Sequence, residues 1–285
     1  MKKRLPLIML IYLIVSVNLI KLPVFADRLI EASLINPAGR VIGERIKLPK
    51  DYHRVSVEKN SFADYLRNLP LKSASSRVKY YNGVEKINHI YVAVVDLDVG
   101  NHDLQQCADA VIRLRAEYLY QRGLYQAIHF NFTNGFRADY TRWMDGYRIQ
   151  INGNQTNWRK QAARSNTYQD FRKYLNLVFT YAGTRSLAQE LKSVPYAKMA
   201  IGDLLIQGGS PGHAVIVVDM AVNQATGEKL YLLAQSYMPA QDIHLLKNLQ
   251  AQSLSPWYSL RERMGTIDTP EWQFYTSDLK RFFSH

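Results

Sequence analysis

Residues 202–219, GDLLIQGGSPGHAVIVVD, and residues 229–237, KLYLLAQSY, carry the clearest structural signal in this 285-residue chain. Apolar, β-branched runs flank a glycine-rich turn in the first stretch, and the second stretch follows after a short polar connection. Strands joined by short connections are typically antiparallel, because a parallel pair needs a long crossover. These stretches therefore predict antiparallel strands over 204–207, 213–221 and 229–237, followed by a short strand over 243–246.

Two helices are expected upstream of these strands. Residues 103–122 repeat apolar side chains at helical spacing, and Gly123 follows as a C-cap. Thr167 with Asp170 three residues later marks the start of a second helix, which we expect to run to residue 192 through Gly183. Helices followed by an antiparallel sheet define the α+β class, with the helices packed on the sheet.

The remaining segments give weaker signals. Residues 27–60 are expected to form a mostly irregular N-terminal lead-in, with short strands over 45–48 and 53–57. Ser61 is placed to cap a short helix that reaches about residue 69. Internal repeats and low-complexity linkers are absent from the sequence, so residues 27–285 are predicted to form a single α+β domain.

Further strands are expected elsewhere in the first two thirds of the chain. The apolar, β-branched runs over 88–99, 128–133 and 147–151 each suit a strand.

The N-terminus predicts the compartment. Lys2, Lys3 and Arg4 precede an apolar run over residues 5–20, and small residues end at Ala26. This pattern is typical of a signal peptide over residues 1–26, and it places the protein in the periplasm or outside the cell. The alternative is an uncleaved membrane anchor, but the run is shorter than the ~20 residues that span a bilayer. A second run of spanning length is absent from the sequence, so the cleaved protein is not expected to be an integral membrane protein.

Composition and charge narrow the class of protein. Apolar residues make up 47 % and charged residues 21 %, which suits a globular chain and excludes disorder or coiled coil throughout. Loss of residues 1–26 removes four of the twelve net positive charges and leaves +8. A basic exported protein suits an anionic cell-envelope polymer or peptide. Basic runs and nucleic-acid motifs are missing, so nucleic acid is not an expected partner.

The single cysteine, Cys107, is the first candidate for chemistry. It lies near the start of the helix over 103–122, where backbone N–H groups and the helix dipole lower the pKa of a thiol. We therefore expect an accessible nucleophile with a low pKa. Its spacing from Leu104 and Val111 equally fits the apolar face of that helix, so a buried inert thiol remains an open alternative.

His213 and Gln235 are the second and third candidates. His213 opens a strand directly after a glycine turn, so its ring is expected at the sheet rim, where it could take a proton from a thiol. Gln235 lies in the following strand and could accept the imidazole N–H, which would fix the tautomer of the ring. The alternatives are a structural histidine and a glutamine that faces water.

Other motifs fail in their context. Residues 208–212 match G-x-S-x-G, but a strand rather than a helix follows, and Pro211 removes an N–H that the oxyanion hole would need. Asp96 and Asp98 start a loop that lacks the calcium-binding glycine and glutamate at the required positions. Zinc motifs such as HExxH and paired CxxC are absent, so neither a metal nor a cofactor is predicted.

The order of these features resembles papain-like cysteine peptidases, and most closely the NlpC-type cell-wall amidases and endopeptidases. The likeness is best over residues 201–246. It implies a papain-like core in which Cys107 attacks an amide carbonyl, His213 is the base and Gln235 orients it. Gln106 is then the candidate for the oxyanion or for substrate contact. Two features depart from that family: Cys107 and His213 lie 106 residues apart, and no Asp-Cys-Ser or Asp-Cys-Gly surrounds the cysteine.

The expected function is therefore an exported cysteine hydrolase that cleaves an amide bond in cell-wall peptides. The alternative is a non-catalytic envelope protein that binds an anionic glycan or peptide on the same scaffold. On the evidence of residues 103–120, 202–219 and 233–244, nearly all of the mature chain also resembles a secreted bacterial family, domain-of-unknown-function family 4846. That resemblance implies no mechanism.

Overall fold

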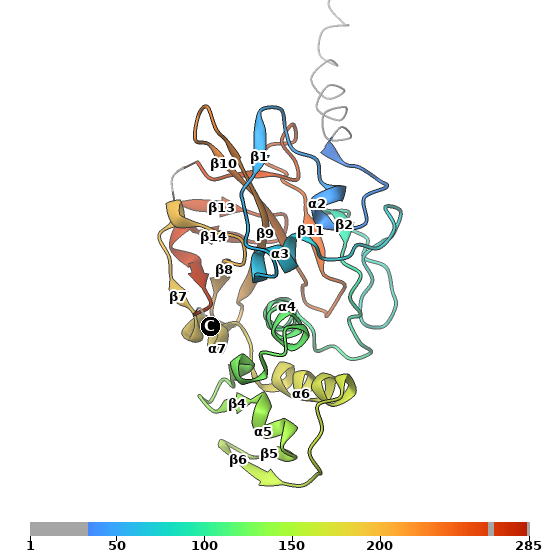
Figure 1. Cartoon of the computed structure of the whole chain (residues 1–285), viewed down its shortest axis with the longest axis vertical. Helices are drawn as coiled ribbons and strands as arrows, with labels where there is room; N and C mark the ends of the chain where they lie inside the picture. The colour runs from blue at the N-terminus through green and yellow to red at the C-terminus, as the bar shows by residue number, and fades with distance from the viewer. Residues whose placement is uncertain (1–33, 262–264, 284–285) are drawn as a thin grey trace, which may run out of the picture.

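A nine-stranded antiparallel sheet forms the centre of the computed structural model, which describes residues 34–261 and 265–283 (Figure 1). The main strand order is β2-β11-β10-β9-β8-β15-β7, with β1 paired to β9 and β12 paired to β10. The expected signal peptide over residues 1–26 lies outside the described residues. Among the described residues, no helix is both long and apolar enough to cross a membrane.

Four consecutive strands confirm the prediction from the apolar runs: β8 (Leu204–Gln207), β9 (His213–Asn223), β10 (Lys229–Gln235) and β11 (His244–Leu246). Each pairs with the next in antiparallel register, and Gln207 lies opposite His213 where β8 turns into β9. The other strands of the sheet are β1 (Tyr52–Arg54), β2 (Tyr91–Val94), β7 (Lys192–Ser193), β12 (Tyr258–Ser259) and β15 (Leu279–Arg281). The chain is thus of the predicted α+β class.

Helix α4 (Cys107–Gln121) packs against β9 and is covered on its other side by a small lobe (Figure 1). It begins four residues later than expected. Asp103 does not cap it, because one of its carboxylate oxygens accepts the backbone N–H of Ala240, at 2.6 Å. Asp109 caps the helix instead, by accepting the backbone N–H of Gln106 at 3.1 Å. Cys107 is consequently the first helical residue.

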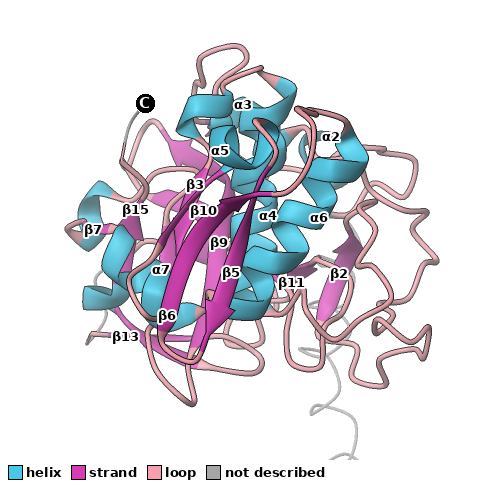
Figure 2. Ribbon diagram, turned by 90° about the horizontal axis from the view of Figure 1, so that it is seen from below, coloured by secondary structure: helices cyan, strands magenta, loops and turns pink. Residues whose placement is uncertain are grey.

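The lobe consists of two hairpins and two helices at one end of the molecule (Figure 1), and in the view from that end one of its hairpins lies in front of the sheet (Figure 2). Its elements are β3 (His129–Asn131), β4 (Arg137–Asp139), α5 (Tyr140–Met144), β5 (Tyr147–Asn152), β6 (Gln155–Lys160) and α6 (Tyr168–Tyr181). One hydrophobic cluster contains Leu204 of the sheet, Leu114 of α4 and Phe171 of α6, so the lobe and the sheet share a core.

One expectation about a helix and one about a strand are wrong. The second predicted helix does not run to residue 192: α6 ends at Tyr181, and α7 (Thr184–Glu190) is a separate helix. Gly183 starts α7, because its N–H is 3.1 Å from the hydroxyl of Ser186 and its carbonyl accepts the N–H of Leu187. The strand expected over 45–48 is also absent, and α2 (Ile42–Arg45) precedes an extended segment there.

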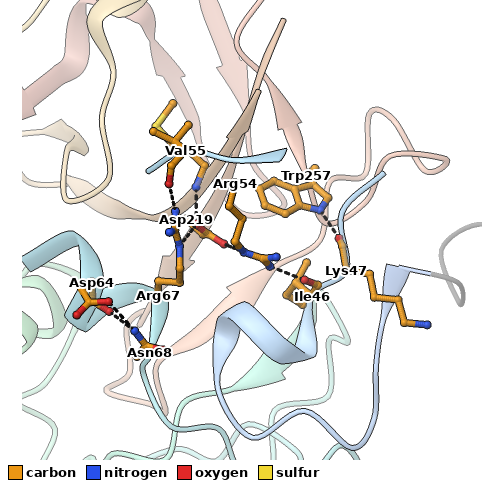
Figure 3. A network of polar contacts seen from close by, with 10 residues as sticks. Ile46, Lys47, Arg54, Val55, Asp64, Arg67, Asn68, Asp219 and Trp257 are labelled. Carbon is orange, nitrogen blue, oxygen red and sulfur yellow. Dashed lines mark hydrogen bonds and ion pairs between the residues drawn. The ribbon is translucent and has the colours of Figure 1, made fainter. Parts of the chain in front are cut away.

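The lead-in is fastened to the sheet by a buried carboxylate. Asp219 of β9 is fully buried and accepts one bond each from Arg54 of β1 and Arg67 of α3 (Phe62–Arg67), both at 2.7 Å (Figure 3). Ser61 caps α3 as expected, since its hydroxyl accepts the N–H of Asp64. Trp257 adds a bond from its indole N–H to the carbonyl of Lys47, at 2.9 Å (Figure 3).

The C-terminal part adds a hairpin that the sequence did not suggest. Strands β13 (Thr266–Asp268) and β14 (Gln273–Tyr275) pair with each other outside the main sheet. The connection between them carries Glu271 and Trp272, and it places both beside the candidate site described next.

Candidate functional site

Cys107 lies where the start of α4 packs against β9, the strand that His213 opens. The Cys107 side chain is half-buried, and its sulfur is approached by the backbone N–H of Ala214, the residue after His213. The N–H groups of Cys107 itself and of Ala108 also face the sulfur, as expected for the open first turn of a helix. The structure therefore brings the predicted cysteine to the predicted histidine strand.

His213 is positioned by the glycine turn before it. A Cβ on Gly212 would lie 2.8 Å from the carbonyl oxygen of Gln207 and would also collide with the hydroxyl of Thr184 in α7. Only glycine allows this close approach, so the close-packed turn fixes the position at which His213 begins β9. The His213 side chain is 1 % exposed, and its ring lies 4.7 Å from that of Tyr237 and 5.4 Å from that of Trp272.

Gln235 binds His213 as the sequence predicts. Its Oε1 is 2.9 Å from Nε2 of the imidazole, and both side chains are buried. The antiparallel pairing of β9 with β10 places the two residues near the same end of the sheet.

The tautomer of His213 follows from a further partner of Gln235. The amide Nε2 of Gln235 donates to the carboxylate of Glu271 at 2.7 Å. An ionised carboxylate only accepts hydrogen bonds, so the NH₂ group must face Glu271 and the carbonyl oxygen must face His213. Nε2 of His213 therefore carries the proton, and Nδ1 is the unprotonated nitrogen that can accept one.

Glu271 and Lys86 are members of the site that sequence reasoning missed. Lys86 is 4 % exposed and its ammonium group lies 2.6 Å from the Glu271 carboxylate. The ammonium is also 5.7 Å from the ring centre of Tyr237. Lys86 and Glu271 lie in irregular segments far apart in the chain, so no periodicity or motif could have joined them. His244 is nearer to prediction, since it pairs with Gln235 across β10 and β11.

His244 completes the buried polar cluster. Its Nδ1 lies 2.8 Å from the carbonyl oxygen of Asp242, which makes that nitrogen the donor. Burial lowers the pKa of His244 to about 3, so the ring is neutral near pH 7.

The pKa of the thiol is shifted in the direction opposite to the one expected from its position at the start of a helix. Burial raises the pKa of Cys107 to about 11, and the nearby Asp109 raises it further, against the lowering effect of three backbone N–H groups. Burial also lowers the pKa of His213 to about 4, although the bond to Gln235 opposes this. Desolvation outweighs the helix dipole here, and the pair rests as a neutral thiol beside a neutral imidazole.

Gln106 is engaged elsewhere in this structure. Its side-chain amide donates to the carboxylate of Asp103 at 3.0 Å, and its backbone N–H donates to Asp109. The N–H groups of Cys107 and Ala108 are the donors that face the sulfur. Within residues 34–261 and 265–283, no group of three or more His, Cys, Asp or Glu side chains is arranged to hold a metal ion.

The fold and this cluster define an α+β protein with a cysteine at a helix start and a histidine–glutamine pair on the adjoining strands. The chain belongs to the family described as Domain of unknown function (4846), whose model matches residues 42–281. That membership confirms the resemblance to this family. Comparison with curated proteins and with solved structures gave no match, so the likeness to NlpC-type enzymes stays a prediction.

Proposed function

We propose that this protein is an exported cysteine hydrolase that cleaves an amide bond in cell-wall peptides, on a papain-like core of the NlpC type. One observation carries the proposal: the Cys107 sulfur lies against the backbone of the His213 strand, and His213 is bonded to Gln235. A nucleophile, a base and a group that orients the base are the three parts that such a reaction needs.

The reaction starts from the neutral pair. As the sulfur of Cys107 attacks the amide carbonyl, Nδ1 of His213 takes the thiol proton, and the N–H groups of Cys107 and Ala108 stabilise the oxyanion. The C–N bond then breaks, and His213 returns the proton to the leaving amine. Water, deprotonated by His213, attacks the thioester; the carboxylic acid leaves and the thiol is restored.

Gln235, Glu271 and Lys86 act as positioning residues in this scheme. Gln235 holds His213 in the tautomer that leaves Nδ1 free to accept a proton, and Glu271 fixes which end of the Gln235 amide faces the ring. Lys86 neutralises the Glu271 carboxylate, which would otherwise be costly to bury.

The substrate class rests on charge and on export. A mature chain of +8 attracts anionic envelope polymers, whose peptides contain amide bonds. The expected location is the periplasm or the cell exterior, which is where such polymers are found.

The experiment is digestion of purified cell-wall peptides, with new amine and carboxyl ends detected by mass spectrometry. Wild type should cleave, and Cys107→Ser should lose at least about a thousandfold in rate, because a serine hydroxyl is the poorer nucleophile. Ser210→Ala is the matched control: it removes the serine of the G-x-S-x-G match and should keep full activity. Full activity in Cys107→Ser would contradict the cysteine mechanism.

A second candidate is a non-catalytic protein that binds an anionic glycan or peptide. The raised pKa of Cys107 and the 1 % exposure of His213 favour it, because both are also properties of a sealed structural pair. Saturable binding of cell-wall peptides with no cleavage, unchanged in Cys107→Ser, would support this function against the hydrolase.

A further inference from the structure

Arg115 of α4 is a buried cation, and none of the residues that the structure describes forms a hydrogen bond with it. Its side chain is 9 % exposed, and its guanidinium group lies 5.0 Å from the ring centre of Phe62, 5.7 Å from that of Tyr118 and 5.3 Å from that of Phe282. Burial lowers its pKa, and no carboxylate contributes to that pKa. Within the described residues, its hydrogen-bond donors therefore face aromatic carbon and solvent rather than an acceptor.

Among the described residues, the other two buried arginines each donate several hydrogen bonds, although Nη1 of Arg45 is left without a partner. Arg113 donates to Glu117 and to Gln105, and Arg45 donates to the carbonyls of Gly39 and Lys72. Burying a charge without a partner costs free energy, and the aromatic rings return only part of it. Such an arrangement is expected where a ligand supplies the missing acceptor.

Arg115 lines a hollow of about 420 Å³, which is the size of a small-molecule site. Lys59 and Arg122 lie at the same hollow and are exposed. One of its two acids, Asp203, is already held by Arg281 through both carboxylate oxygens. The other acid, Glu58, is exposed, so the hollow keeps an excess of positive charge.

We propose that this hollow binds a small oxyanion, a carboxylate or a phosphate monoester, carried on a ring-bearing molecule. The planar fork of a guanidinium group matches two oxygens of such an anion. Phe62, Tyr118 and Phe282 surround the guanidinium and line the same hollow, so the body of a ring-bearing ligand would contact aromatic side chains there. The site is independent of the proposed hydrolase, because it uses none of Cys107, His213 or Gln235.

The test is calorimetric titration of the full chain with phenyl phosphate, benzoate, inorganic phosphate and the neutral benzyl alcohol. Phenyl phosphate should bind at one site and more tightly than inorganic phosphate. Its affinity should fall as the salt concentration is raised. Benzyl alcohol should not bind. Arg115→Lys keeps the charge but loses the planar guanidinium group. This variant should lower the affinity for phenyl phosphate at least about tenfold.

Arg148→Lys is the matched control. Arg148 also stacks on an aromatic ring, 4.1 Å from the centre of Trp143, but it donates to the carbonyls of Trp143 and Tyr147. Its replacement should leave binding unchanged. Should Arg115→Lys fail to fold, the double variant Lys59→Gln/Arg122→Gln at the exposed rim should weaken binding about threefold or more.

Three results would overturn the site. They are the absence of saturable phenyl phosphate binding to wild type, equal binding by benzyl alcohol, and unchanged affinity in folded Arg115→Lys. None of them bears on peptide cleavage, so this proposal and the proposed function fail separately.

Discussion

At the scale of single residues, Glu271 is the group that sets the chemistry of His213. Replacing it with glutamine gives Gln235 a partner that can accept as well as donate, so the Gln235 amide can turn over. We expect Glu271→Gln to convert His213 from the Nε2–H form to a mixture of tautomers, seen in the ¹⁵N shifts of the ring by NMR. Hydrolysis, where measured, should fall about tenfold or more.

Lys72→Met is the control for that variant. It breaks an ion pair of the same kind, between Lys72 and buried Asp242, without touching Gln235. The His213 ring should keep its wild-type ¹⁵N shifts in this variant. A pure Nε2–H ring in Glu271→Gln would mean that Glu271 does not hold the Gln235 amide.

The buried state of His213 predicts an effect of pH on stability. Its pKa falls from 6.5 in the unfolded chain to about 4 in the folded protein, so below pH 6.5 the unfolded chain gains a proton that the folded protein does not. The contribution of His213 to the free energy of unfolding therefore falls as the pH falls from 6.5 to about 4. Relative to His213→Gln, wild type should lose up to about 3 kcal/mol over that range.

Urea unfolding of both proteins across this pH range measures the difference directly. His53→Gln, which replaces an exposed histidine of β1, is the control and should follow wild type. A free-energy difference between wild type and His213→Gln that stays constant with pH would show that the ring titrates alike in both states.

At the scale of elements, Asp219 joins β1 and α3 to β9. Asp219→Asn removes the charge that two arginines share and should destabilise the fold by about 3 kcal/mol, measured by urea unfolding. Glu228→Gln, which breaks the pair with the exposed Arg261, should cost less than about 1 kcal/mol. Equal effects of the two variants would show that the buried carboxylate does not fasten the lead-in.

Element prediction succeeded where local pattern and tertiary contact agree. The apolar strands β8 to β11 are buried along almost their whole length, so their composition was sufficient to find them. The prediction of one continuous helix through Gly183 was wrong because the hydroxyl of Ser186 caps the start of a new helix, α7, at this glycine. Short elements such as α2 have too few residues for a period, and contacts with distant segments decide their conformation.

At the scale of the whole molecule, the sequence predicts the class of fold and half of the site. Cys107, His213 and Gln235 could be predicted as site residues, because the start of a helix and two neighbouring strands position them. Glu271 could not be predicted, since its position depends on how the hairpin of β13 and β14 folds back over the sheet. Lys86 could not be predicted either, since it lies in an irregular segment that carries no pattern. The pKa of Cys107 was misjudged for the same reason: local dipoles are visible in a sequence, whereas burial is a property of the folded chain.

The central claim is that Cys107 and His213 act as one unit, and the alkylation rate of Cys107 tests it most directly. Iodoacetamide should modify folded wild type at pH 7 at least about tenfold faster than folded His213→Gln, because only wild type has a base for the thiol proton. Both should react equally once unfolded in guanidinium chloride. Equal rates in the folded proteins, or a folded wild-type thiol that does not react at all, would contradict the account.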